Sequence, residues 1–165
     1  MAIGADNAGE TQAKRLERVY EEVARLLRDP SITARLGTAP GADAWSAMQV
    51  LGHMTEMIPY WLNWCRVLIA ATGEPPEFGR TAGSPERLAG VRHGATTKSD
   101  VLLAQLEGEV RDAARAIRTL SATERSKRGR SSEGGEMTVA EVIESFIVGH
   151  AEEHLAQVQT ALQTQ

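Results

Sequence analysis

Several residue types are scarce in this sequence, and each scarcity excludes a class of protein. Cys65 is the single cysteine, so an internal disulfide is excluded and we expect a reducing, cytoplasmic location. Aromatic residues make up 4% of the chain, which disfavours a fold built from strands. No apolar run approaches the length of about 18 residues that crosses a membrane. The first ten residues lack a basic region and an apolar block, so we expect no signal peptide.

An excess of positive charge is also missing. The chain has 18 Lys and Arg residues against 22 Asp and Glu residues, a formal net charge of -4. A surface that neutralises phosphates needs the opposite balance, so nucleic acid is not expected as a partner. Hydrophobic residues at 42% and charged residues at 24% are ordinary for a globular protein, and the length fits one domain over 1–165.

Apolar residues recur every three or four positions in four long segments, which predicts four amphipathic helices. Ser46 with Gln49, and Thr138 with Glu141, match the capping box that opens a helix. No segment alternates apolar and polar residues as a strand does, so we predict an all-α four-helix bundle. The helices are expected at 11–28, at 45–71, at 98–120 and from 138 onward.

The connections between these helices differ in length. Residues 29–44 are rich in turn formers and are expected to form a short link. Residues 73–96 form a long crossover, with one short helix expected near Ser84–Arg87, and it lets the second and third helices run parallel. Residues 125–137 are charged and glycine-rich, and we expect an irregular mobile loop there.

The apolar face of the last helix is interrupted by two histidines. Where the spacing calls for two more aliphatic side chains, the chain has His150 and His154, one helical turn apart on the same side. Two such imidazoles can bind one cation, whereas the simpler interpretation is two hydrogen-bonded core histidines. A third ligand decides between these interpretations.

A third histidine occupies a similar place in the second helix. His53 falls on that helix's apolar stripe, while His93 lies beside Gly94 in the crossover and is expected to be exposed. Three of the four histidines therefore face the predicted core from two helices.

Other metal-site patterns fit less well. A di-iron bundle needs Glu-x-x-His on two helices, and none of the three histidines has a glutamate three residues before it. The residues His150–His154 match H-x-x-E-H, but only eleven residues follow to supply that motif's downstream ligand. Three neutral imidazoles suit Zn(II), Ni(II) or Fe(II) and leave one coordination position open, as in catalytic sites.

The motifs Trp45-Ser46-x-x-x-x-Leu51-Gly52-His53 and His150-x-x-x-His154 resemble the DinB-like (damage-inducible) superfamily of four-helix metalloproteins. The helix order, the long crossover and the chain length agree as well. The resemblance implies an up-down-down-up bundle in which His53, His150 and His154 bind a divalent metal. Better understood members use mycothiol, bacillithiol or glutathione to couple or isomerise small molecules, and others look like metal-dependent hydrolases.

Two function classes stay open at this point. One is a metal-dependent enzyme that acts on a small molecule, either a thiol S-transferase or a hydrolase, with a low-molecular-weight thiol as a further cofactor. The other is a non-catalytic metal-binding or ligand-binding stress-response protein in which the ion ties the second helix to the fourth. A fourth protein ligand would favour the second class.

Several further residues lie near the histidines. Met57 and Trp61 could line a substrate pocket, although core packing is the simpler interpretation. Glu56 and Glu153 could orient an imidazole, although exposed glutamates on the helix surface are the simpler interpretation. Cys65 lies about 18 Å along the helix from His53, too far to be a ligand.

A homodimer is expected from the width of the apolar surface of the second helix. Apolar residues occupy more than one of its sides, which means either deep burial or a second packing surface. The residues in question are Ile58, Leu62, Cys65 and Ile69.

Overall fold

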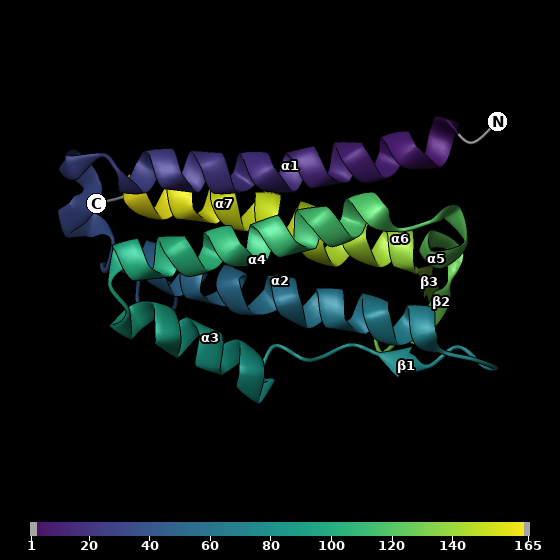
Figure 1. Ribbon diagram of the computed structural model, residues 1–165. Coiled ribbons are helices and arrows are strands. Elements are labelled where there is room, and N and C mark those ends of the chain that lie inside the picture. Colours follow the sequence, from purple (N-terminus) through teal and green to yellow (C-terminus); the bar gives the residue numbers. More distant parts are fainter. Residues whose placement is uncertain (1–2, 164–165) are drawn as a thin grey trace.

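The computed structural model describes residues 3–163 and contains four long helices (Figure 1). The last of them is continuous but consists of three parts, α6, a π-helical segment and α7. Figure 1 shows α1 and α7 running in one direction and α2 and α4 in the other, which is the predicted up-down-down-up order. The bounds are α1 Ile3–Leu27, α2 Ala47–Ala70, α4 Ser99–Thr119, α6 Val139–Val142, the π segment Ile143–Val148 and α7 Gly149–Gln163.

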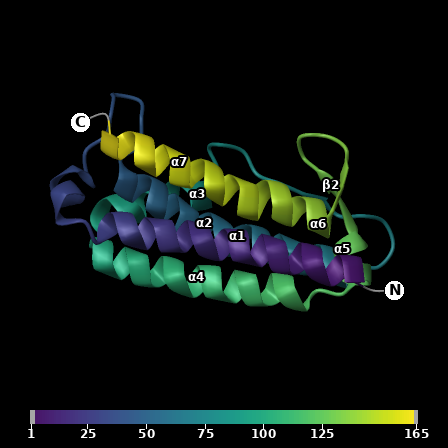
Figure 2. The same cartoon turned by 90° about the horizontal axis from the view of Figure 1, so that it is seen from above.

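The four helices enclose one hydrophobic core. Seen from above, α1 lies between α7 and α4, with α2 beneath them (Figure 2). Both α1 and α2 pack against α4 and α7, so each apolar face is covered by two neighbours. Ile58, Leu62 and Cys65 are buried inside the monomer, so the wide apolar surface of α2 does not require a second chain. Within residues 3–163, no helix is long and apolar enough to cross a membrane.

The predicted capping boxes are confirmed. Ser46 Oγ accepts from the Gln49 amide, and the Gln49 side chain accepts from the Ser46 amide. Thr138 and Glu141 form the same reciprocal pair at the start of the last helix. These two boxes fix where the helices that carry the histidines begin.

The crossover contains a longer helix than the sequence predicts. The helix α3 spans Pro85–Thr96 and packs against α2 through glycines on both helices. A Cβ atom on Gly52 would lie 2.3 Å from the Gly90 carbonyl oxygen and 2.5 Å from the Gly94 Cα. Gly52, the neighbour of His53, therefore allows the two backbones to touch.

The prediction of an irregular loop at 125–137 is wrong. The strands β2 Arg128–Ser131 and β3 Glu136–Thr138 form a hairpin, and β1 Glu77–Phe78 adds to β2 in parallel. Gly134 and Gly135 make the turn at φ values of 106° and 82°, which glycine adopts without strain. The strands are short and polar, so they carry no alternating pattern. Two further short helices, η1 Pro30–Arg35 and α5 Ala122–Ser126, lie in connections.

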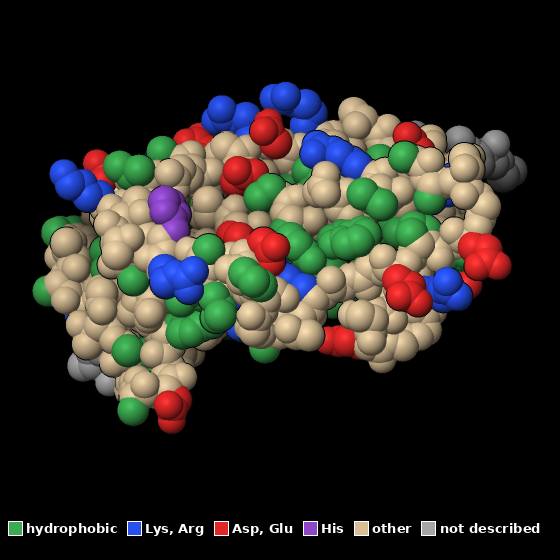
Figure 3. Space-filling view, turned by 90° about the horizontal axis from the view of Figure 1, so that it is seen from below, with side chains coloured by type: hydrophobic (Ala, Val, Ile, Leu, Met, Phe, Trp, Pro, Cys, Tyr) green, Lys and Arg blue, Asp and Glu red, His purple; other side chains and the backbone are tan. Residues whose placement is uncertain are grey.

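The side of the molecule formed by α3 and β1 is partly apolar. Figure 3 looks onto this side and shows hydrophobic side chains gathered in a band, with charged residues around it. Leu88 of α3 is among the large hydrophobic residues that remain exposed.

The last helix changes its hydrogen-bond pattern just before the first histidine. The Gly149 amide donates to the Glu144 carbonyl, five residues back, which defines a π turn. The Glu144 side chain is held by α1, because it accepts from Gln12 at 2.9 Å and from Arg15 at 2.8 Å. The first helix therefore supports the π segment from outside the core.

Candidate metal centre

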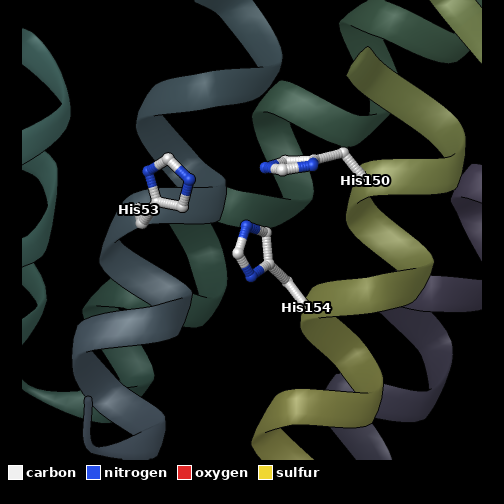
Figure 4. A group of neighbouring side chains, drawn as sticks. All are labelled: His53, His150 and His154. Carbon is white, nitrogen blue, oxygen red and sulfur yellow. The ribbon is translucent and has the colours of Figure 1, made fainter. Parts of the chain in front are cut away.

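The structure brings together the three histidines that the sequence singles out. His53 on α2 and His150 and His154 on α7 point toward one another across the gap between the helices (Figure 4). One ring nitrogen of each lies within 4.8 Å of the others. His53 and His154 are buried, whereas the His150 side chain is 35% exposed. His93 is exposed, as predicted, and its side chain is hydrogen-bonded to Gln105 instead.

Two of the three histidines have buried ring nitrogens without a protein partner. Both ring nitrogens of His53 and Nε2 of His154 are buried without a hydrogen bond. A buried polar atom left without a partner costs free energy, so these nitrogens require a ligand. Two nitrogens that each lie 2.0–2.1 Å from one ion are at most about 4.2 Å apart, so small ring rotations would close the group around an ion. The residues present therefore fit a divalent metal.

Each histidine has an oxygen acceptor near Nδ1, three residues further along its helix. His154 Nδ1 donates to Gln157 Oε1 at 2.8 Å. Glu153 Oε2 lies 3.4 Å from Nδ1 of His150, and Glu56 Oε2 lies 3.5 Å from Nδ1 of His53. The hydrogen bond to Gln157 holds the proton on Nδ1 of His154, which leaves the Nε2 lone pair for a metal. The longer glutamate contacts place an acceptor beside Nδ1 of His150 and of His53 without forming a hydrogen bond in the described structure.

Glu56 is itself fixed by the crossover. Arg80 donates to both carboxylate oxygens of Glu56, and the Arg80 guanidinium carbon lies 4.1 Å from the centre of the Tyr60 ring. Burial alone would raise the pKa of Glu56, but contacts with His53 and Arg80 lower it. The carboxylate therefore stays ionised beside His53.

Burial keeps the other two histidines neutral. Desolvation is the main cause that lowers the pKa of His150. Desolvation and the neighbouring His150 lower the pKa of His154 to about 4. A metal-binding imidazole must be free of a proton at the ligating nitrogen, so this environment favours the form that binds metal.

A cavity of 170 Å³ lies against His53 and His150. Its lining comes from α2, the crossover, α3, the hairpin tip and the last helix, which are far apart in the sequence. Trp61 is among the lining residues and stacks on Phe146 with ring centres 4.4 Å apart. Met57 is fully buried in the core and does not line this cavity. The remaining lining residues are Arg80, Thr81, Ala82, Arg87 and Glu133.

Three residues of the site carry no signal in the sequence that identifies them. Phe146 and Arg80 reach the site only through the packing of helices and crossover, whereas Gln157 is an ordinary polar residue three positions beyond His154 on the same helix. The π segment does carry a signal, because the apolar positions Val139, Ile143 and Ile147 recur in steps of four residues. A step of four residues turns an α-helix by about 40° more than a full turn, so the apolar positions would move gradually around the helix. The wider π turn brings them back to one face.

A helical bundle with three convergent imidazoles from two helices, beside a small cavity, defines a candidate metalloprotein of the DinB type. Residues 15–158 match the sequence profile of the DinB superfamily, and the chain belongs to that superfamily. The resemblance inferred from the two histidine motifs is thus confirmed. A comparison with curated proteins gives no match.

Two solved structures share the fold. YfiT from Bacillus subtilis is described as a probable metal-dependent hydrolase with an unusual four-helix bundle topology. It is 17% identical, the match covers 91% of this chain and 85% of YfiT, and the TM-score is 0.65. A mutant of a mycothiol-dependent maleylpyruvate isomerase is 16% identical with a TM-score of 0.64. That match covers 95% of this chain but only 59% of the isomerase.

Proposed function

We propose that this protein binds one divalent transition-metal ion through His53, His150 and His154 and is a metal-dependent enzyme that acts on a small molecule. The observation that carries the proposal is the convergence of three imidazoles, two of which, His53 and His154, have ring nitrogens that are buried without a partner. Zn(II), Ni(II) and Fe(II) all suit three imidazole nitrogens.

The cavity supports a catalytic role over a structural one. The cluster has three members within the described part of the chain, and a structural zinc site normally has four protein ligands. The cavity lies against two of the three histidines, where a substrate would have access. When bound, the ion would lower the pKa of a water molecule or hold a thiolate.

The chain's own residues would prepare this site for the ion. Gln157 keeps the Nδ1 proton of His154 in place and leaves Nε2 for the ion. Glu56 and Glu153 lie where they would do the same for His53 and His150. The Trp61–Phe146 stack forms an apolar wall that excludes water from one side of the cavity. Both reaction classes remain candidates, hydrolysis by similarity to YfiT and thiol-dependent transfer by similarity to the isomerase.

Metal analysis of the purified protein tests this proposal. We expect about one divalent ion per chain, and we expect His150→Ala or His154→Ala to remove most of it, because two imidazoles bind an ion far more weakly than three. His93→Ala is the matched control, since His93 is exposed on α3, and should leave the metal content unchanged. Full metal loading of the His150→Ala variant would show that the assignment is wrong. Hydrolase and thiol-transfer screens of the loaded protein would then separate the two reaction classes.

A further inference from the structure

Two arginines line the cavity, and they differ in whether a carboxylate neutralises their charge. The charge of Arg80 is matched by Glu56, which it contacts with two hydrogen bonds. Arg87, on α3, has only neutral partners among the described residues. It donates to the Ala82 carbonyl at 2.7 Å, and its guanidinium carbon lies 4.7 Å from the centre of the Trp45 ring.

The position of Arg87 is fixed toward the histidines. Trp45, on which it stacks, is in edge contact with the His53 ring at 5.4 Å between centres. The charge of Arg87 also contributes to lowering the pKa of both His150 and His154. A cation that is held by a ring and a carbonyl, yet paired with no carboxylate, retains donors for an anion.

The cavity also contains a carboxylate, which has to be weighed against this charge. Glu133 belongs to the lining, but it sits at the exposed tip of the hairpin and forms no ion pair with Arg87 within the described residues. Three neutral imidazoles cancel none of the charge of a divalent ion. With the ion bound, the cavity therefore remains positive even when Glu133 is counted.

The lining also has an aromatic part, and the cavity is close to the size of one ring. Trp61 and Phe146 stack at an interplanar angle of 16° and present a continuous aromatic surface. The cavity volume of 170 Å³ is similar to the roughly 150 Å³ that holds one benzene molecule in an apolar protein cavity.

We propose that this cavity binds a small carboxylate with an apolar body of about one ring, and that Arg87 binds the carboxylate group. The proposal rests on the proposed function in placing the reactive part of the substrate beside the histidines. The apolar body lies against Trp61 and Phe146. Arg87 is thus a specificity-determining residue that selects acids over their neutral analogues.

Benzoate and benzamide serve as matched probes, because they differ in charge and hardly in shape. Titrations of the metal-loaded protein by NMR or calorimetry should give benzoate at least about tenfold tighter binding than benzamide, as expected for a charge-assisted hydrogen bond. Arg87→Ala should weaken benzoate binding by about tenfold or more and leave benzamide binding and metal content unchanged. Arg87→Lys should recover part of the loss. Arg92→Ala, an exposed arginine on the same helix, is the control and should behave as the wild type.

Three results would overturn the assignment of Arg87. These are equal affinity for the two probes, no detectable binding of either, or benzoate binding that Arg87→Ala leaves intact because the carboxylate goes to the ion. A repeat with chelator-treated protein separates this proposal from the metal proposal. If metal analysis shows that the protein binds no metal, an Arg87-dependent preference for benzoate would still support the carboxylate site, while the metal centre would be refuted. A protein that binds no metal and shows no preference for benzoate over benzamide would refute both proposals.

Discussion

At the scale of single residues, the three histidines are held by a repeated local device. Each Nδ1 faces an oxygen that lies three residues further along the same helix, on Glu56, Glu153 or Gln157. Residues at this spacing are neighbours on a helix surface, so the device needs no tertiary contact to form. Within the described residues, Glu56 alone of the three is further anchored, through Arg80 and the crossover.

Glu56→Gln should therefore weaken metal binding by about 10-fold to 100-fold, because the amide loses both the charge beside His53 and the paired contact with Arg80. A competition titration against a chromophoric chelator measures the affinity. Glu153→Gln is the matched control, since the Glu153 side chain is 77% exposed and has no arginine partner in the described structure, and its effect should be smaller. Equal affinity of Glu56→Gln and wild type would rule out this positioning role.

At the scale of elements, the contact between α2 and α3 depends on glycines, which have no side chain to separate the two helices. The glycines at 52, 90 and 94 let the two backbones approach, and Gly94 would place a Cβ 2.1 Å from the Met48 carbonyl oxygen. Because Gly52 precedes His53, this contact also sets the position of one candidate ligand.

Gly52→Ala should destabilise the protein by about 1–3 kcal/mol, since the added methyl group must push two backbones apart. Gly108→Ala on α4 is the opposite case, because nothing lies within 4 Å of its added Cβ. That variant should stabilise the fold by about 0.5–1 kcal/mol through helix propensity. Urea unfolding of both variants gives the comparison, and a neutral Gly52→Ala would contradict the close packing.

The elements also differ in how far the sequence reveals them. The starts of α2 and α6 were predictable because Ser46 and Thr138 form capping boxes with residues three positions on. The strand β2 was not, since it is short and polar and one of its two partners, β1, lies about fifty residues earlier in the chain. The full length of α3 was missed for a related reason, as it is held by glycine contacts and not by an apolar stripe. The histidine cluster was predictable from spacing, whereas Arg80 and Phe146 depend on the packing of distant segments.

At the scale of the whole molecule, the histidines connect α2 to α7, and their protonation should affect global stability. The pKa of His154 is lowered from 6.5 to about 4, so the unfolded chain takes up a proton at a higher pH than the folded one. The neutral residue thus stabilises the fold fully above about 6.5, and this contribution of at most about 3 kcal/mol is lost as pH falls toward 4. The same window weakens metal binding, because protons compete for the ligands.

Thermal midpoints between pH 7.5 and 5 should therefore fall as pH falls, more steeply for the metal-loaded protein than after chelation. Desolvation would raise the pKa of Glu144, but its contacts with Gln12 and Arg15 lower it below the ordinary value of 4.5. Such carboxylates therefore contribute to acid unfolding mainly below this range. His154→Gln should flatten the dependence, while His93→Gln should not change it. Midpoints that stay constant from pH 7.5 to 5 and do not respond to chelator would show that no ion joins the two helices.

The π segment bears on how chains of this superfamily should be compared. A π turn accommodates one residue more than the α-helical turn it replaces, so the stretch from Val139 to His150 is one residue longer than a regular helix with the same end positions. In a relative that lacks the π turn, equivalent histidines would align with His150 and His154 only after a one-residue gap is opened within 143–148. The number of residues in the π segment therefore determines the direction in which the two histidines of α7 face.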